Sequence, residues 1–172
     1  MEQAREAQIL DQIRSFALPH YTEIPNVGLY LEQTAKYISE YLSVLGDYAL
    51  TGSMISNYVK KGLVANPVKK QYDRDQIGYL MFIALAKSVL SMEDIGLLIR
   101  LQKDTYPPAM AYEYYRRELE NVLQYVFGLK PELENVSRDH TDAKKLLRNT
   151  IIAVAHKVYL NKYFAAFHRE QE

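Results

Sequence analysis

The side chains of this sequence that are best suited to binding chemistry lie close together in one short segment. Four polar residues recur at three- and four-residue steps within a short segment: Ser53, Ser56, Asn57 and Lys60. On an α-helix this spacing puts them on one face. An asparagine amide can bond the edge of an adenine, and a serine hydroxyl can bond a base or a phosphate. The segment therefore predicts a helix whose outward face fits the major groove of DNA.

Unopposed positive charge surrounds the same segment. The chain is neutral overall, with 21 lysines and arginines against 21 aspartates and glutamates. Residues 48–72 nevertheless contain no acid, and their basic residues are Lys60, Lys61, Lys69 and Lys70. A locally positive field attracts phosphates even on a neutral protein. We expect these lysines to bind the DNA backbone and to set affinity, not sequence preference. The alternative is that they are merely solvated.

The residues around this face predict the helix that must position it. Thr51 is a good N-cap, because its hydroxyl accepts a backbone N–H of the first turn. Gly62 supplies the left-handed residue that ends a helix, and Leu63 supplies the apolar contact that accompanies it. The inward face is apolar: Ile55, Tyr58 and Val59.

Apolar periodicity predicts helices along the rest of the chain as well. The expected ranges are 2–18, 31–45, 74–89, a shorter helix from 92 that ends before Pro107, 109–127 and 141–168. Asp73 with Gln76 forms a capping-box pattern, and Ser91 caps the next helix. Pro67 excludes a helix between residues 63 and 72, where we expect a loop or a very small β-wing. No convincing strand pattern occurs. The expected fold is all-α, a helix-turn-helix embedded in a bundle of about seven helices.

This reading divides the chain into three parts. Residues 1–30 form an N-terminal helix and an irregular link. Residues 31–105 form the DNA-binding domain. Residues 106–172 form a C-terminal helical pair for dimerisation or effector binding, in which four tyrosines stand out: Tyr112, Tyr115, Tyr159 and Tyr163. Tyrosine is enriched in pockets and interfaces, so these residues suggest an effector pocket or a dimer surface, with core packing as the alternative.

Several functional classes lack their signatures. The chain has no cysteine, no glycine-rich phosphate loop and no Gly-x-Ser-x-Gly elbow. No two of its four histidines lie three or four residues apart. We therefore expect no enzyme, no cofactor and no metal. The N-terminus lacks the pattern of a signal peptide and no apolar run could span a bilayer, so we expect a cytoplasmic protein without a membrane partner.

The order of these features resembles a known family. The segments Ile55–Val64, Pro67, Tyr72-Asp73 and Leu90–Ile99 stand where the DNA-binding domain of the bacterial MerR regulators has its recognition helix, wing and following helix pair. The resemblance covers about residues 31–101. The whole chain also resembles an uncharacterised bacterial family described as a domain of unknown function with MerR-like character.

This resemblance implies a transcriptional regulator that binds double-stranded DNA, generally as a homodimer, and that responds to a small-molecule or protein effector. The chain departs from the MerR pattern where Ser56 and Gln71 replace arginines, so phosphate binding would fall to the lysines, which lack the bidentate fork of arginine. The alternative function is a non-enzymatic, antirepressor-like module that keeps the all-α shape and binds a protein instead of DNA.

Overall fold

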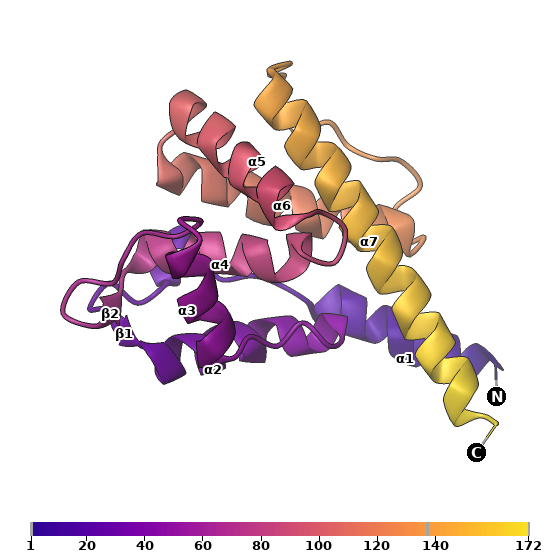
Figure 1. Cartoon of the computed structure of the whole chain (residues 1–172). Helices are drawn as coiled ribbons and strands as arrows, with labels where there is room; N and C mark the ends of the chain where they lie inside the picture. Colours follow the sequence, from indigo (N-terminus) through magenta and orange to yellow (C-terminus); the bar gives the residue numbers. More distant parts are fainter. Residues whose placement is uncertain (1, 137, 172) are drawn as a thin grey trace.

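The computed structural model describes residues 2–136 and 138–171, and within them seven α-helices and one small sheet (Figure 1). The helices are α1 (Glu2–Ser15), α2 (Leu31–Leu42), α3 (Gly52–Lys60), α4 (Arg74–Ala86), α5 (Met92–Thr105), α6 (Pro108–Val126) and α7 (Asp142–Arg169). The strands are β1 (Leu29–Tyr30) and β2 (Gln71–Tyr72). Short 3-10 turns lie at Tyr21–Glu23 and Ser43–Leu45. The predicted all-α fold is confirmed.

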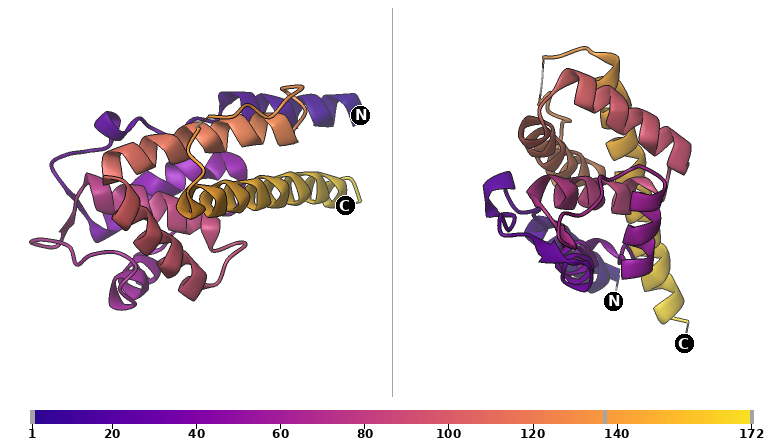
Figure 2. Two further views of the ribbon diagram at one scale, coloured as in Figure 1. Left: turned by 90° about the horizontal axis from the view of Figure 1, so that it is seen from above. Right: turned by 60° about the vertical axis from the view of Figure 1, so that its left-hand side comes forward.

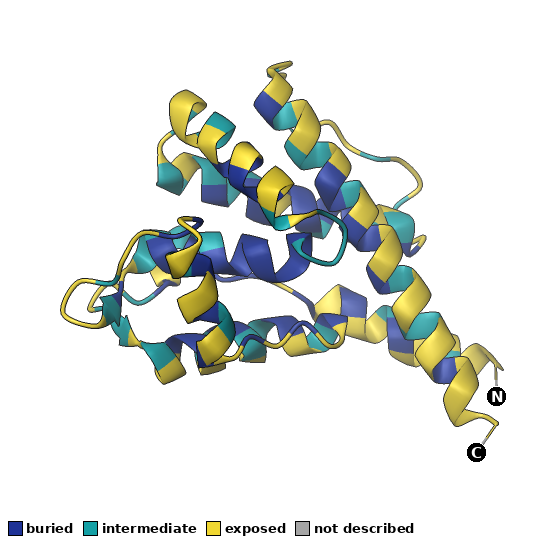
Figure 3. Ribbon diagram, viewed as in Figure 1, coloured by how far each residue is buried: buried dark blue, intermediate teal, exposed yellow. Residues whose placement is uncertain are grey.

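Helix α4 is the central element of the fold. Every residue from Gln76 to Ala86 except Tyr79 is buried, and Figure 3 shows this helix dark along its length. Helix α2 packs on α4 from one side, whereas α6 packs on it from the other. The long α7 runs along α5 and α6. Figures 1 and 2 show both chain termini at one end of the molecule and the β1–β2 pair at the opposite end.

The predicted helix starts agree with the structure to within one residue, but three predicted ends were wrong. Helix α1 ends at Ser15 instead of Leu18: Pro19 keeps the residue before it out of the helical conformation, and the Phe16 N–H donates to the Ile13 carbonyl in a tighter last turn. Helix α2 ends at Leu42 instead of Leu45, because the chain tightens into a 3-10 turn over Ser43–Leu45. Helix α4 ends at Ala86 instead of Val89, because the backbone tightens there into a turn in which the Val89 N–H donates to the Ala86 carbonyl.

The strand β1 was not predicted, because two residues are too few for a recognisable alternation. It pairs antiparallel with β2, so that Leu29 faces Tyr72 and Tyr30 faces Gln71. Gly28 precedes the strand with φ of +81°, and a Cβ there would lie 3.0 Å from the Cβ of Gln71. The link that the sequence left irregular therefore supplies one half of the sheet.

One connected hydrophobic core extends from α1 to α7. Its largest fully buried side chains come mainly from α2, α3 and α4, with Ile13 from α1 and Ile95 from α5. This core runs across residues 30 and 105. The division of the chain at these two positions stays a prediction. Among the described helices, none combines the length and apolar character that a membrane crossing requires.

Candidate nucleic-acid interface

Helix α3 is fixed at its start by side chains that act on its backbone. The Thr51 hydroxyl accepts the Met54 N–H at 3.2 Å, which confirms the predicted N-cap. On α2, the Ser39 hydroxyl accepts the Leu50 N–H at 3.0 Å and donates to the Leu50 carbonyl at 3.3 Å. These bonds anchor the turn between α2 and α3 to α2, so α3 leaves that turn in a defined direction.

The end of α3 is equally well defined. Gly62 has φ of +76°, its N–H donates to the Val59 carbonyl, and the Leu63 N–H donates to the Tyr58 carbonyl at 3.0 Å. This is the Schellman pattern, which confirms the roles predicted for Gly62 and Leu63. The buried Leu63 side chain lies against Gly96 of α5, where an added Cβ would come within 3.1 Å of it. The close approach of α5 therefore supports the end of α3.

The two faces of α3 separate as the sequence predicted. Ile55 and Tyr58 are buried, and Val59 is half-buried. The whole outward set is exposed: Ser53, Ser56, Asn57 and Lys60. Figure 3 shows exposed residues along the outer side of α3, with no other segment drawn across it. The structure thus brings these four side chains together on an open surface, and whether they bind DNA stays a prediction.

The second pair of lysines lies at the tip of a β-hairpin. Val68 and Gln71 exchange two backbone hydrogen bonds, of 3.1 and 2.9 Å, around Lys69 and Lys70. Both lysines have positive φ, of 51° and 63°, which identifies a type I′ turn. The tip extends away from the helices in Figure 1. We call residues 68–72 the wing; the sequence left this segment open between a loop and a short wing.

The wing and α3 lie on the same part of the molecule, the end opposite the chain termini (Figures 1 and 2). Lys60, Lys61, Lys69 and Lys70 are all exposed. Across the part of the chain that the structure describes, none of these four forms an ion pair. Their charges therefore remain available to a phosphate backbone.

An acidic side chain borders the start of α3. The exposed Glu32 of α2 lies so close to Gly52 that a Cβ there would meet its carboxylate oxygen. Glu32, Lys36 and Ser53 also line a shallow, open groove between α2 and α3. A carboxylate at a helix N-terminus is favourable for the helix dipole, but it repels a phosphate at the same place. The positive surface consequently begins beyond the first turn of α3.

Sequence reasoning missed how α4 holds the wing. The predicted capping box is confirmed: the Gln76 N–H donates to Asp73 at 2.9 Å and the Asp73 N–H to Gln76 at 2.7 Å. The Gln76 amide nitrogen also donates to the carbonyls of Ala65 and Asn66, at 2.9 and 3.0 Å. One buried side chain therefore ties the α3–wing link to α4. The sequence predicted the capping role of Gln76 but gave no sign of its bonds to Ala65 and Asn66.

The four tyrosines of the predicted effector or dimer surface fall into two places. Tyr112 and Tyr115 are buried on α6 and line a pocket beside α4. Tyr159 and Tyr163 are half-buried on α7, with ring centres 4.5 Å apart, and Tyr159 also contacts Phe127. Neither role predicted for this set is tested by these positions. Among the described residues, no three acidic or histidine side chains lie close enough together to hold a metal ion.

The sequence that forms this surface matches a known protein family. The family model described as "Domain of unknown function (DUF1836)" matches residues 19–115. The chain belongs to the DUF1836 family. The DUF1836 match runs from before β1 into α6, so it contains α3, the wing and α4, while α1 and α7 lie outside it. No curated protein and no solved structure matches the chain. Nothing in these comparisons supports the likeness to MerR regulators, which stays a prediction.

Proposed function

We propose that this DUF1836 protein is a MerR-like transcriptional regulator that binds double-stranded DNA. Helix α3 lies in the major groove, and the wing contacts the neighbouring phosphates. The observation that carries the proposal is the exposed polar face of α3 with four lysines on and near it, which form no ion pair with any residue that the structure describes. Asn57 and the serines contact base edges, while the lysines contact the backbone. This role requires no catalytic step.

The positions of the two lysine pairs support simultaneous contact with one duplex. Lys60 and Lys61 lie at the end of α3, and Lys69 and Lys70 at the tip of the wing. A helix in the major groove has a phosphate strand on either side, so a hairpin beside it meets the adjacent strand. Gln76 ties the link that precedes the wing, at Ala65 and Asn66, to α4, and so fixes the point from which the wing extends.

The salt dependence of duplex binding tests this proposal. Each phosphate that a lysine neutralises adds about 0.9 to the slope of log K against log salt concentration. Replacing all four lysines by glutamine should therefore reduce the slope by about 3 to 4 and weaken binding to random-sequence duplex at low salt. As a control, Lys145→Gln with Lys157→Gln, both at exposed positions of α7, should leave the slope nearly unchanged. Equal slopes for the wild type and the fourfold variant would contradict the proposal.

Homodimerisation is a further part of the proposal, because a two-fold dimer matches two DNA half-sites. Helix α7 supports it with a stripe of exposed apolar side chains at helical spacing: Leu160, Phe164 and Phe167. Light scattering should give about twice the mass of one chain, 20.0 kDa. The mass of a single chain would contradict homodimerisation, and the proposal would then be DNA binding by a monomer.

A protein-binding, antirepressor-like module is the second candidate. It is favoured by the serine and glutamine at positions 56 and 71, where MerR-like domains carry arginine, and by the carboxylate of Glu32 beside α3. Such a module would bind a partner protein through the same exposed face of α3. Affinity that is insensitive to salt, or absent for DNA, would favour it over the regulator.

A further inference from the structure

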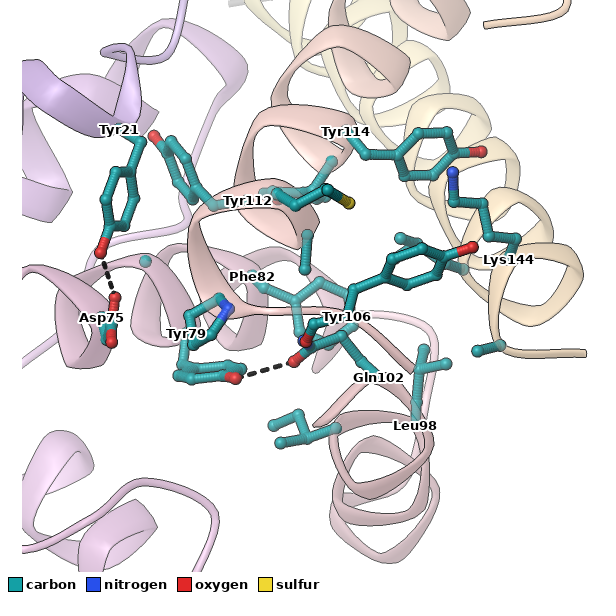
Figure 4. Close-up of a pocket in the computed structure, with 18 residues that line it drawn as sticks. Tyr21, Asp75, Tyr79, Phe82, Leu98, Gln102, Tyr106, Tyr112, Tyr114 and Lys144 are labelled. Atoms are coloured by element: carbon teal, nitrogen blue, oxygen red, sulfur yellow. Dashed lines mark hydrogen bonds between the residues drawn. The ribbon is translucent and has the colours of Figure 1, made fainter. Parts of the chain in front are cut away.

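A pocket lies on the side of α4 away from α2, between α4, α5, α6 and the start of α7 (Figure 4). It encloses about 80 Å³. One water needs roughly 10–15 Å³ of such space, so the pocket could hold several waters. A molecule of about one or two fused rings would therefore fit. Aromatic rings form much of the wall: Tyr21, Tyr79, Phe82, Tyr106, Tyr112 and Tyr114.

Most polar groups of the wall are already paired within the protein. The Tyr21 hydroxyl donates to Asp75, the Tyr79 hydroxyl donates to Gln102 at 2.7 Å, and the Tyr112 hydroxyl donates to the Pro19 carbonyl at 2.7 Å. Figure 4 shows the first two of these bonds along one side of the pocket. These groups make few further demands on a ligand, so the surface they leave is largely apolar.

The Tyr115 hydroxyl is not among these paired groups. Tyr115 is 5% exposed, and its hydroxyl has no hydrogen-bond partner among the residues that the structure describes. Its ring packs edge-on against Phe82, with ring centres 5.5 Å apart. The hydroxyl is closed off from the space of the pocket, so Tyr115 contributes its ring and not its hydroxyl to the wall.

The charges at the pocket offset each other. Among the described lining residues, only Asp75 and Lys144 are charged, and Figure 4 shows them at opposite ends. Asp75 accepts the Tyr21 hydroxyl. Lys144 lies over the Tyr114 ring, 3.9 Å from its centre, and over the Tyr106 ring at 5.0 Å. Each charged side chain thus already interacts with aromatic residues of the protein at its own end of the pocket. We therefore expect neither charge to select a ligand of opposite sign.

We propose that this pocket binds a small, flat, uncharged aromatic molecule. The ring of the ligand packs among the tyrosine and phenylalanine rings. The site is separate from the exposed face of α3. Binding to it is measured without DNA, so its outcome does not depend on whether α3 binds a duplex.

Three related probes test the class of ligand by titration calorimetry. Indole is neutral and has one N–H donor, indole-3-acetate is its anionic relative, and tryptamine is its cationic relative. We expect indole to bind one molecule per chain and at least tenfold more tightly than either charged probe. No binding of indole, or tighter binding of a charged probe, would overturn the proposal.

Two variants test the place of binding. Ala111→Phe fills the pocket from its wall and should abolish indole binding, whereas Ala153→Phe on the exposed side of α7 should not. Circular dichroism checks that both fold. Indole binding that survives Ala111→Phe, or that is lost in Ala153→Phe, would overturn the proposal.

Discussion

At the scale of single residues, the wing tip combines an unfavourable backbone with two exposed positive charges. Lys69 and Lys70 both occupy the left-handed region, which costs a residue with a Cβ about 1–2 kcal/mol. Asparagine followed by glycine is the pair that type I′ turns prefer. The two lysines therefore lower stability at a position where both are exposed to solvent. Strain of this kind is often retained at functional sites.

Replacing Lys69→Asn and Lys70→Gly should separate stability from function. The new pair fits the turn, so urea unfolding should show a gain of about 1–2 kcal/mol. Duplex affinity at low salt should fall, because two phosphate contacts are lost. Removing two α7 lysines, by Lys145→Asn with Lys157→Asn, should leave affinity unchanged. A stabilised variant with full affinity would show that the wing does not contact DNA.

Glu118 gives a residue-scale prediction about pH. Its side chain is fully buried on α6, and its carboxylate lies 3.1 Å from the Arg148 Nε. Burial raises the pKa of Glu118 above its ordinary value of 4.5, and the charge of Arg148 offsets only part of this rise. Just above pH 4.5, the folded chain therefore binds more protons at this site than the unfolded chain. This contribution makes the free energy of unfolding decrease as pH rises.

The variant Glu118→Gln removes that titration. Relative to the wild type, it should gain stability as pH rises from about 4.5 through the raised pKa, and then show a constant difference. Glu93→Gln, at an exposed position on α5, provides the control. Urea unfolding across this pH range measures the difference. A wild-type and Glu118→Gln pair with parallel pH profiles would contradict the assigned pKa direction.

At the scale of elements, helix starts were predictable and their long-range connections were not. Thr51, Asp73, Ser91 and Thr141 cap their helices through the backbone N–H three residues on, a local interaction that the sequence displays directly. Strand β1 depends on its pairing with β2, which lies about 40 residues further along the chain. The gathering of Tyr21 and Tyr79 around the predicted Tyr112 was invisible for the same reason, since these residues come from three separate segments.

The contact between α4 and the wing link gives the prediction at this scale. Gln76→Met keeps the length of the side chain but removes both bonds to the Ala65 and Asn66 carbonyls as well as the capping bond. Gln33→Met in α2 removes only the bond that Gln33 accepts from the Tyr30 N–H. We expect Gln76→Met to lower the free energy of unfolding by about 2–3 kcal/mol and Gln33→Met by about 1 kcal/mol or less. Similar losses in urea unfolding would mean that the carbonyl bonds add nothing.

At the scale of the whole molecule, the proposed DNA-binding surface and the elements that support it lie in different regions. The exposed face of α3 and the wing occupy one end, both termini the other, and the buried α4 lies between them with the aromatic pocket on its flank (Figures 1 and 4). A neutral chain thereby carries a local positive surface, which the count of charges alone conceals. The sequence revealed that asymmetry, because the acid-free stretch at 48–72 is continuous along the chain.

The most direct test of the central claim attaches a DNA-cleaving reagent to α3. The chain has no cysteine, so Asn57→Cys creates a single thiol for an iron–EDTA conjugate. His168→Cys, exposed near the end of α7, provides the control. We predict that the conjugate at position 57 cleaves duplex DNA at low salt, that added salt suppresses the cleavage, and that the conjugate at position 168 cleaves no more than free reagent. Equal cleavage from the two positions would contradict the placement of α3 in the groove.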